Sequence, residues 1–409
     1  MRWRFGQYEL DAGRRELRVD GALAPLQPQV FDVLRYLVAH RDRVVVKAEL
    51  LQALWPDAVV TDASLQRAVS QARRALRGAD REMVRTHARH GYRFVGAVEE
   101  IEADPADEVL DGPTRYARNG QVHVAYRTVG RGPVDVVLVL GWSLSMRSAL
   151  QLPGARELVR ALATRARVVL FDKRGTGDSD RVKALPTLIQ REQDLEAVLD
   201  ALRSPGAILV GFSEGGPLAI AFACRRPART RGLALVGAFA RMAASPDHPA
   251  GWSATQVEGL RAYVGAGWGR GATLLAIVPE RHRSDGVRAW AVRAEQEGAS
   301  PGAALDLVEM NLDIDVRSML GDVRVPTVVL HAAGDRVVSA GNGRALAKAI
   351  RGARLVEEPG DDHSFLFARR KVLTGELERL LDQVTPPRAL TSSRPRRSLS
   401  PRAGRRSGR

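Results

Sequence analysis

Residues Ala207-Ile208-Leu209-Val210-Gly211-Phe212-Ser213-Glu214-Gly215 decide the fold of the longer part of this chain. The first four form an apolar run typical of a buried strand, and the sequence continues through Gly216-Pro217-Leu218 as the start of a helix. A strand that turns sharply through small residues into a helix lifts the Ser213 hydroxyl out of the backbone, where a base can reach it and amide N–H groups can face it. A glycine-rich turn with a bystander serine is the alternative, but the strand before it and the helix after it favour a nucleophile.

A serine hydroxyl is a poor nucleophile until a base takes its proton, and the base needs a carboxylate that holds its tautomer. Asp335 follows the apolar run 327–330 on a turn, as a catalytic acid at the end of a late strand would. His363 is the last of eight histidines and lies in a loop after the short strand expected at 353–356. We therefore predict Ser213 as nucleophile, Asp335 as acid and His363 as base, in the order Ser, Asp, His along the chain.

Three nearby residues offer competing assignments. His331 lies inside the predicted strand, where a histidine is more often packed or hydrogen-bonded than catalytic. Asp361 and Asp362 flank the base, and we expect them to shape its loop. A solvated loop pair without catalytic role is the alternative interpretation of Asp335 and His363.

Attack on a carbonyl places negative charge on oxygen, and backbone N–H groups can stabilise that charge. We expect one N–H from Glu214, directly after the nucleophile, and one from Trp142 in the loop after the first long strand. Ser143 and Ser145 in the same loop are equally well explained as helix caps.

The sequence around these residues alternates short apolar runs with longer helical stretches. This pattern predicts a mostly parallel sheet covered by helices, the α/β class. The region 239–320 interrupts the rhythm with tryptophans among helical pieces, and we predict that it forms a helical cap over the active site. The apolar runs are 134–140, 168–171, 207–210, 232–236 and 327–330.

The first 98 residues follow a different, α+β pattern. Alternating stretches within 2–19 predict a small antiparallel sheet, and apolar spacing predicts helices at 26–40, 47–54 and about 62–76. The third helix has one apolar stripe, and its remaining, basic faces can contact phosphate. Residues 84–95 predict two short strands around a basic turn, which together form a wing.

Charge and composition divide the chain further. The formal net charge is +15, of which residues 1–98 hold +6, with 17 basic and 11 acidic residues. The tail 386–409 has eight arginines and no acidic residue, so both ends favour polyanions. We predict a linker at 99–112, a second domain at 113–385 and a disordered basic tail.

Some function classes are excluded at this stage. The single Cys224 cannot form an internal disulfide and is expected to be a packed thiol. No run approaches the length that a bilayer demands, and the N-terminus does not read as a signal peptide, so we expect a cytoplasmic protein without a membrane partner. We expect neither a cofactor nor a metal ion.

The motif Phe171-Asp172-Lys173-Arg174-Gly175-Thr176-Gly177-Asp178-Ser179-Asp180, taken with the serine, acid and base motifs above, resembles the α/β-hydrolase superfamily over about residues 113–383. The likeness is greatest to the branch fused to regulatory and cyclase domains. It implies a Ser213, Asp335 and His363 triad. The chain departs from many members at Leu140-Gly141, where they have His-Gly.

Residues 1–98 resemble the winged-helix DNA-binding domain of the OmpR/PhoB class of response regulators. The matching features are Leu26-Gln27-Pro28, residues 50–55, the helix 64–76 and the wing 85–95. The resemblance implies that the third helix enters the major groove of double-stranded DNA while the wing reaches the minor groove. The residues expected at DNA are Gln66, Arg67, Ser70, Arg73 and Arg74 on the helix, and Arg89 or His90 on the wing.

One departure and one alternative interpretation limit what this second resemblance implies. The chain lacks a receiver domain with a phosphoacceptor Asp, so control by phosphorelay is not expected. The alternative interpretation is that the helix arginines merely solvate an exposed face.

The two halves together predict a transcriptional regulator whose serine hydrolase domain binds or hydrolyses a small ester, amide or lactone-like compound. One alternative is an ordinary hydrolase whose winged helix only localises or dimerises it, so a homodimer is possible. Another is a sensor that never completes turnover.

Overall fold

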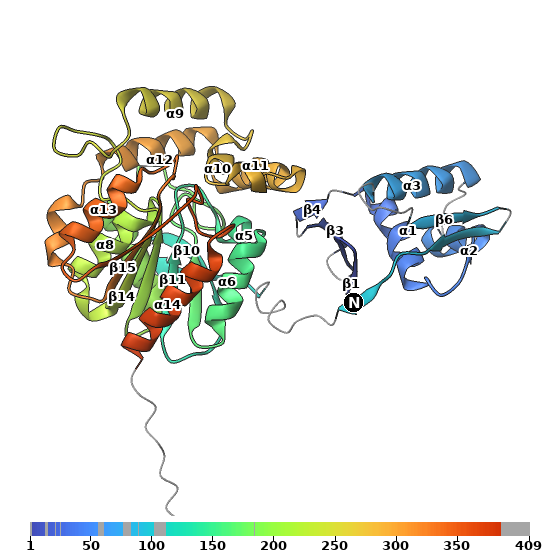
Figure 1. Ribbon diagram of the computed structural model, residues 1–409, viewed down its shortest axis with the longest axis horizontal. Helices are drawn as coiled ribbons and strands as arrows, with labels where there is room; N and C mark the ends of the chain where they lie inside the picture. The colour runs from blue at the N-terminus through green and yellow to red at the C-terminus, as the bar shows by residue number, and fades with distance from the viewer. Residues whose placement is uncertain are drawn as a thin grey trace, which may run out of the picture.

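The computed structural model describes residues 2–12, 15–20, 22–24, 26–55, 61–76, 83–88, 90–101, 112–183 and 185–385. Two folded units follow one another along the chain, residues 2–101 and 112–385, each with its own hydrophobic core (Figure 1). Within the described residues no helix combines the length and the apolar character needed to cross a bilayer.

The N-terminal unit begins with an antiparallel sheet in the strand order β4-β3-β2-β1-β8. Alternate side chains on its strands, such as Trp3, Phe5 and Leu10, are buried, as the alternating sequence predicts. The strands are β1 (Arg2–Phe5), β2 (Tyr8–Asp11), β3 (Glu16–Val19), β4 (Ala22–Ala24) and β8 (Glu99–Ile101).

Three helices and a small second sheet complete this unit. The apolar faces of α1 (Pro28–Ala39) and α3 (Asp62–Ala75) pack together, and α2 (Lys47–Leu54) contributes Leu50 to the same core. Strands β5 (Val45–Val46), β7 (Gly91–Phe94) and β6 (Val84–His87) form the second sheet, in that order, and β6 and β7 make up the predicted wing. The predicted helices and wing are therefore confirmed to within two residues.

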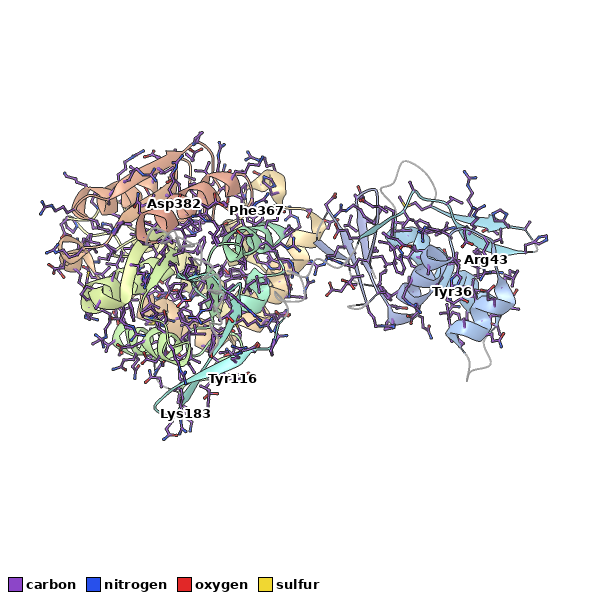
Figure 2. All side chains as sticks on the ribbon, turned by 90° about the horizontal axis from the view of Figure 1, so that it is seen from below. Tyr36, Arg43, Tyr116, Lys183, Phe367 and Asp382 are labelled. Carbon is purple, nitrogen blue, oxygen red and sulfur yellow. The ribbon has the colours of Figure 1, made fainter. Side chains whose placement is uncertain are left out.

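A polar cluster joins α1 to α2. Tyr36 Oη donates a hydrogen bond to Glu49 at 2.9 Å, and Arg43 donates two more at 2.8 and 2.6 Å. The bonds from Arg43, assisted by the one from Tyr36, lower the pKa of Glu49 to about 2 despite partial desolvation. Figure 2 labels Tyr36 and Arg43 on this unit.

The predicted linker at 99–112 starts too early. Residues Glu99–Ile101 form β8, which pairs with β1 in the register Arg4↔Glu99, and Arg41 also donates to Glu100 at 3.0 Å. The acidic composition suggested a linker, but these carboxylates pair with arginines of the N-terminal unit. Residues 102–111 and the predicted tail 386–409 lie outside the described residues.

The second unit is built on an eight-stranded sheet in the order β16-β15-β14-β13-β11-β12-β10-β9. Strands β9 and β10 form an antiparallel hairpin, β10 pairs antiparallel with β12, and all other neighbours are parallel. The central strands are buried on both faces, which explains their continuous apolar runs. The strands are β9 (Arg115–Asn119), β10 (Val122–Val129), β11 (Asp135–Val139), β12 (Arg167–Phe171), β13 (Ala207–Phe212), β14 (Thr230–Val236), β15 (Thr327–Ala332) and β16 (Arg354–Glu358).

Helices cover both faces of this sheet. On one face α6 (Pro153–Ala163) and α14 (Arg370–Val384) pack together, near the short α5 (Met146–Ala149). On the other face α7 (Leu188–Ala201), α8 (Gly215–Arg225) and α13 (Ala340–Ala349) bury their apolar stripes.

Between β14 and β15 the chain leaves the sheet, and the helices of this segment lie over one end of the sheet in Figure 1. This agrees with the predicted helical cap. The helices are α9 (Ala254–Gly267), α10 (Ala272–Ala276), α11 (Asp285–Gly298) and α12 (Pro301–Asp313), with short 3-10 turns at Glu280–His282 and Arg317–Asp322.

Candidate active site

Ser213 occupies a strained turn between β13 and α8. Its φ is +50°, a left-handed conformation that is costly for a residue with a side chain. The turn is held by hydrogen bonds from Ser213 N to Val236 O and from Gly216 N to Ser213 O, both 2.9 Å. A Cβ on Gly215 would lie 2.1 Å from Val139 O, so the chain can pass here only with glycine. The local sequence therefore builds the sharp corner that exposes one hydroxyl.

Asp335 and His363 meet beside this corner. The His363 Nδ1 lies 2.6 Å from Asp335 Oδ2, while Asp335 Oδ1 accepts N–H groups from Val337 and Val338 at 2.8 and 3.0 Å. Burial alone would raise the pKa of Asp335, but the His363 charge, hydrogen bonds from His331 and His363 and the Val338 N–H together hold it far below its ordinary value. The acid thus stays ionised and can hold the imidazole orientation.

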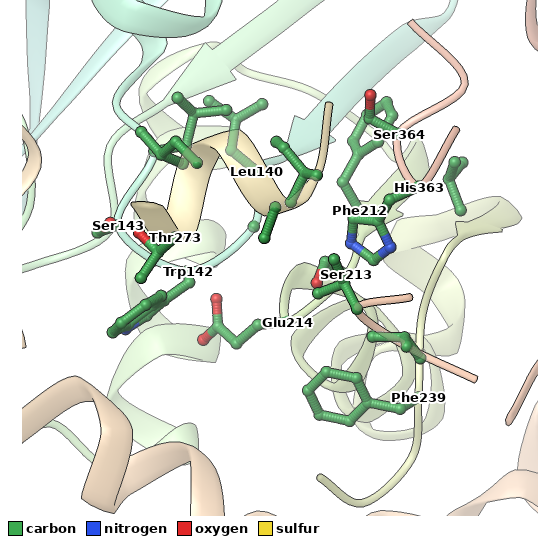
Figure 3. A pocket seen from close by; sticks show the side chains of 18 of the residues that line it. Leu140, Trp142, Ser143, Phe212, Ser213, Glu214, Phe239, Thr273, His363 and Ser364 are labelled. Carbon is green, nitrogen blue, oxygen red and sulfur yellow. The ribbon is translucent and has the colours of Figure 1, made fainter. Parts of the chain in front are cut away.

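The other imidazole nitrogen faces the serine. His363 Nε2 is buried and has no hydrogen-bond partner among the described residues, and His363 and Ser213 line the same cavity. Figure 3 shows the imidazole next to the Ser213 hydroxyl. A Cβ on Gly237 would lie 2.9 Å from His363 Nδ1, so the absence of a side chain after β14 lets the ring pack here. The structure brings together the three residues expected to form the triad.

Two of the competing residues have structural roles. His331 Nε2 donates to Val338 O at 2.8 Å and lies 3.4 Å from Asp335 Oδ2, so it supports the acid from within β15. Asp362 Oδ2 accepts three consecutive backbone N–H groups, from residues 367–369, and so shapes the loop that carries His363.

Two backbone N–H groups are available as oxyanion donors. In the described part of the chain neither Trp142 N–H nor Glu214 N–H has a hydrogen-bond acceptor. The loop carrying Trp142 borders the nucleophile, because a Cβ on Gly141 would lie 3.3 Å from Ser213 Cβ. Ser145 Oγ accepts from Ser148 N at 3.1 Å and caps α5, in agreement with the helix-cap interpretation of that serine.

Behind the oxyanion loop lies an ion cluster that the sequence did not indicate. The side chains of Lys173, Glu214 and Arg191 are 2%, 4% and 1% exposed, and both cations bond directly to the Glu214 carboxylate. Lys173 Nζ also donates to Leu140 O at 3.0 Å. Burial opposes ionisation of Glu214, but the charges of Lys173 and Arg191 and their hydrogen bonds lower its pKa. Lys173 lies in the motif at 171–180, yet nothing in that motif shows that Lys173 would meet the residue after the nucleophile.

The cavity in front of the triad has a volume of about 400 Å³ and a largely apolar wall. It lies between the sheet and the cap, since α9, α10 and α12 all contribute to its lining. This volume suits a small molecule of low polarity.

The expected DNA-contacting residues lie on one helix and at the tip of the wing. Gln66, Arg67, Ser70 and Arg74 are exposed on α3, and His90 is exposed at the turn between β6 and β7. Arg89 lies outside the described residues.

Arg73 is placed differently from its neighbours on α3. Its guanidinium donates from Nε to Val84 O at 2.9 Å and from Nη2 to Thr86 Oγ1 at 2.7 Å. It therefore links α3 to the wing strand β6. The helical periodicity could not distinguish this role from DNA contact, because it shows which face of α3 is polar but not what that face contacts.

Comparison with known families agrees with both units. Residues 136–369 match the family described as alpha/beta hydrolase fold, and residues 21–94 match the family described as transcriptional regulatory protein, C terminal.

Individual relatives cover the second unit. The chain is 29% identical over 259 residues to a putative carbamate hydrolase RutD of Azorhizobium caulinodans, a match that spans 61% of this chain and 91% of that protein. It is 30% identical over 240 residues to a pimeloyl-[acyl-carrier protein] methyl ester esterase of Chromobacterium violaceum, spanning 58% and 89%.

Solved structures give the same result. A bromoperoxidase from Bacillus anthracis superposes with a TM-score of 0.59 at 26% identity, covering 66% of this chain and 100% of that one. An enol-lactonase from Burkholderia xenovorans superposes with a TM-score of 0.56 at 25% identity, with the same coverage. The chain belongs to the α/β-hydrolase family and is a serine hydrolase preceded by a domain of the OmpR/PhoB C-terminal type.

Proposed function

We propose that this protein hydrolyses a small carboxylic ester or lactone through Ser213 and that occupancy of its active site controls binding of the N-terminal domain to DNA. The observation that carries the catalytic half is the His363 ring, which bonds Asp335 through Nδ1 and presents an unpartnered Nε2 on the side of Ser213. The two free N–H groups of Trp142 and Glu214 supply the donors that such a reaction requires.

The proposed reaction proceeds in two halves. Ser213 Oγ attacks the ester carbonyl carbon while its proton passes to His363 Nε2, and the carbonyl oxygen takes up negative charge between the two N–H donors. Collapse of this intermediate breaks the bond to the leaving oxygen, which receives the proton from His363. Water then attacks the acyl-serine in the same way, which releases the carboxylic acid and restores the Ser213 hydroxyl.

The regulatory half rests on the exposed basic face of α3 and on the path from the cavity to the N-terminal unit. Helix α10 lines the cavity, α11 packs against α10, and α11 also lies next to β4 of the N-terminal sheet (Figure 1). A ligand that shifts the cap has a direct route to the DNA-binding unit. The proposal includes double-stranded DNA as the partner and the cytoplasm as the location of the protein. That the protein forms a homodimer stays a prediction.

Two measurements on the full-length protein test the proposal. A fluorophosphonate probe should label the wild type but not Ser213→Ala, and only the wild type should hydrolyse 4-nitrophenyl acetate. Equal hydrolysis rates for the two proteins would refute the serine mechanism. Gel shifts on DNA upstream of the gene should show that the DNA affinity of Ser213→Ala changes when an ester saturates its active site. DNA affinity that does not change with the ester would favour a hydrolase whose winged helix only localises it. Labelling by the probe without ester hydrolysis would favour a non-catalytic sensor.

A further inference from the structure

The order of strands divides the cavity into two sides. Ser213 follows β13, which lies between β11 on one side and β14 on the other. Cavity residues carried by β11, β12 and the helices after them therefore lie on one side of the nucleophile. Those in the loops directly after β14 and β15 lie on the other, while the cap helices extend over both sides.

The β11–β12 side is apolar. Its wall includes Leu138 on β11, Leu170 on β12 and four residues of α6 and its N-cap, all of them buried core residues. Those four residues are Leu152, Ala155, Leu158 and Val159. This side takes a hydrocarbon group and offers no charge to a substrate.

The β14–β15 side carries the cationic charges. Arg241 follows β14, and Arg336 follows β15 directly after the catalytic acid. Arg241 is partly engaged, since it donates to Ser245 Oγ at 3.0 Å and lies 3.8 Å from Asp315. Arg336 is exposed at the cavity and has no hydrogen bond or ion pair with any described residue.

No free carboxylate balances these two arginines within the lining. Glu214 is the one acidic residue among the described residues that line the cavity, and Lys173 and Arg191 already neutralise it. The other polar residues that follow β14 and β15 in the lining, among them Gln256, Asn311 and Asn342, are uncharged. Arg336 thus presents to this side of the cavity a cation without a partner among the described residues, and a guanidinium can bind a carboxylate with two parallel hydrogen bonds.

From this asymmetry we infer that the substrate carries a carboxylate, bound by Arg336 with help from Arg241. The carboxylate and the apolar group of the substrate lie on opposite sides of the scissile bond. This rests on the proposed hydrolase function and narrows its substrate to anionic esters. Arg336 acts as a specificity residue, because it contacts the substrate away from the reacting atoms.

A matched pair of esters tests the inference. 4-Nitrophenyl hydrogen adipate and 4-nitrophenyl hexanoate have acyl chains of the same length and differ in a terminal carboxylate. We expect kcat/KM to favour the adipate ester about tenfold, the effect of one charge-assisted hydrogen-bond pair at a partly open site. Arg336→Gln should abolish that ratio mainly through KM, and Arg336→Lys should restore part of it.

The control is Arg351→Gln, which removes an exposed arginine outside the cavity that likewise has no partner among the described residues. This variant should keep the wild-type ratio. An equal ratio for the two esters in the wild type, or an unchanged ratio in Arg336→Gln, would overturn the inference.

A binding measurement separates this inference from the hydrolase proposal. Calorimetry with Ser213→Ala should show tighter binding of monomethyl adipate than of methyl hexanoate, and the difference should vanish in Ser213→Ala/Arg336→Gln. Absence of turnover with this binding preference present would refute the hydrolase and keep the carboxylate site. Turnover that depends on Ser213, without preferential binding of the carboxylate ester, would support the hydrolase and refute the carboxylate site.

Discussion

Replacing Lys173 by methionine should damage catalysis more than its distance from the substrate suggests. Lys173 does not line the cavity, yet its Nζ joins Leu140 O of the oxyanion loop to the carboxylate of Glu214. These are the two segments whose N–H groups, on Trp142 and Glu214, are the proposed oxyanion donors. Lys173 therefore fixes the distance between the two donors, and methionine fills its volume without that link.

Two magnitudes follow from these contacts. Breaking a fully buried ion pair by removing one partner costs about 3 to 5 kcal/mol of stability, with the lower end expected because Arg191 still neutralises Glu214. A misplaced oxyanion donor lowers kcat by about 100-fold to 1,000-fold. We expect KM to change little, because the cavity wall is intact.

The assay compares Lys173→Met with Arg174→Met. Arg174 is the next residue, is also buried, and pairs with Asp194 at 2.6 and 2.7 Å without any bond to the oxyanion loop. Urea unfolding should show a loss of stability in both variants, and kinetics with 4-nitrophenyl hexanoate, under conditions where both are folded, should show loss of kcat in Lys173→Met alone. Equal kcat values for the two variants would refute the positioning role and leave Lys173 as a structural ion.

Three further predictions concern the triad, the DNA-binding face and the stability of the fold. Asp335→Asn should lower kcat about 10,000-fold with little change in KM, because the amide cannot stabilise the imidazolium of His363. Arg74→Ala should weaken DNA binding and reduce its salt dependence by about one phosphate contact, whereas Arg73→Ala should first lower the melting temperature, because it releases the wing. Burial raises the pKa of Asp172 to about 6, so the folded state holds its proton where the unfolded state has lost it. Stability relative to Asp172→Asn, measured by urea unfolding, should therefore fall by about 2 kcal/mol as pH rises from 4 to 6.

Much of the fold could be predicted from the sequence, because local patterns determine it. The central strands are buried on both faces and read as apolar runs, and the helices of the N-terminal unit have single apolar stripes. The boundary at residue 99 could not be predicted, because the pairing of β8 with β1 joins segments almost a hundred residues apart. Acidic residues that look like a linker along the chain become partners of Arg4 and Arg41 in space.

The site divides in the same way. Ser213 was predictable because the strand, the glycines and the helix that create its strained turn are consecutive, and Asp335 and His363 because each follows a recognisable strand. The link from Lys173 to Glu214 was not predictable, since it depends on how β12 and β13 bring their carboxyl ends together across β11. Arg73 shows the same limit, because one face of a helix can meet DNA or a neighbouring strand and periodicity does not distinguish them.

The proposed control of DNA binding by the ligand requires that the cap has more than one arrangement. A ligand shifts DNA affinity only by as much as its own affinity differs between two states of the protein. The cavity is bounded by α10, and α11 beside it contacts β4 while Trp290 Nε1 on α11 donates to Ser148 O of the α5 segment at 2.8 Å. Helix α11 is therefore fastened to the hydrolase core, lies one helix away from the ligand and touches the N-terminal sheet. Hydrolysis of the ligand would return this helix to its ligand-free arrangement. In a regulator of this kind, the catalytic site would therefore terminate the signal without a second factor.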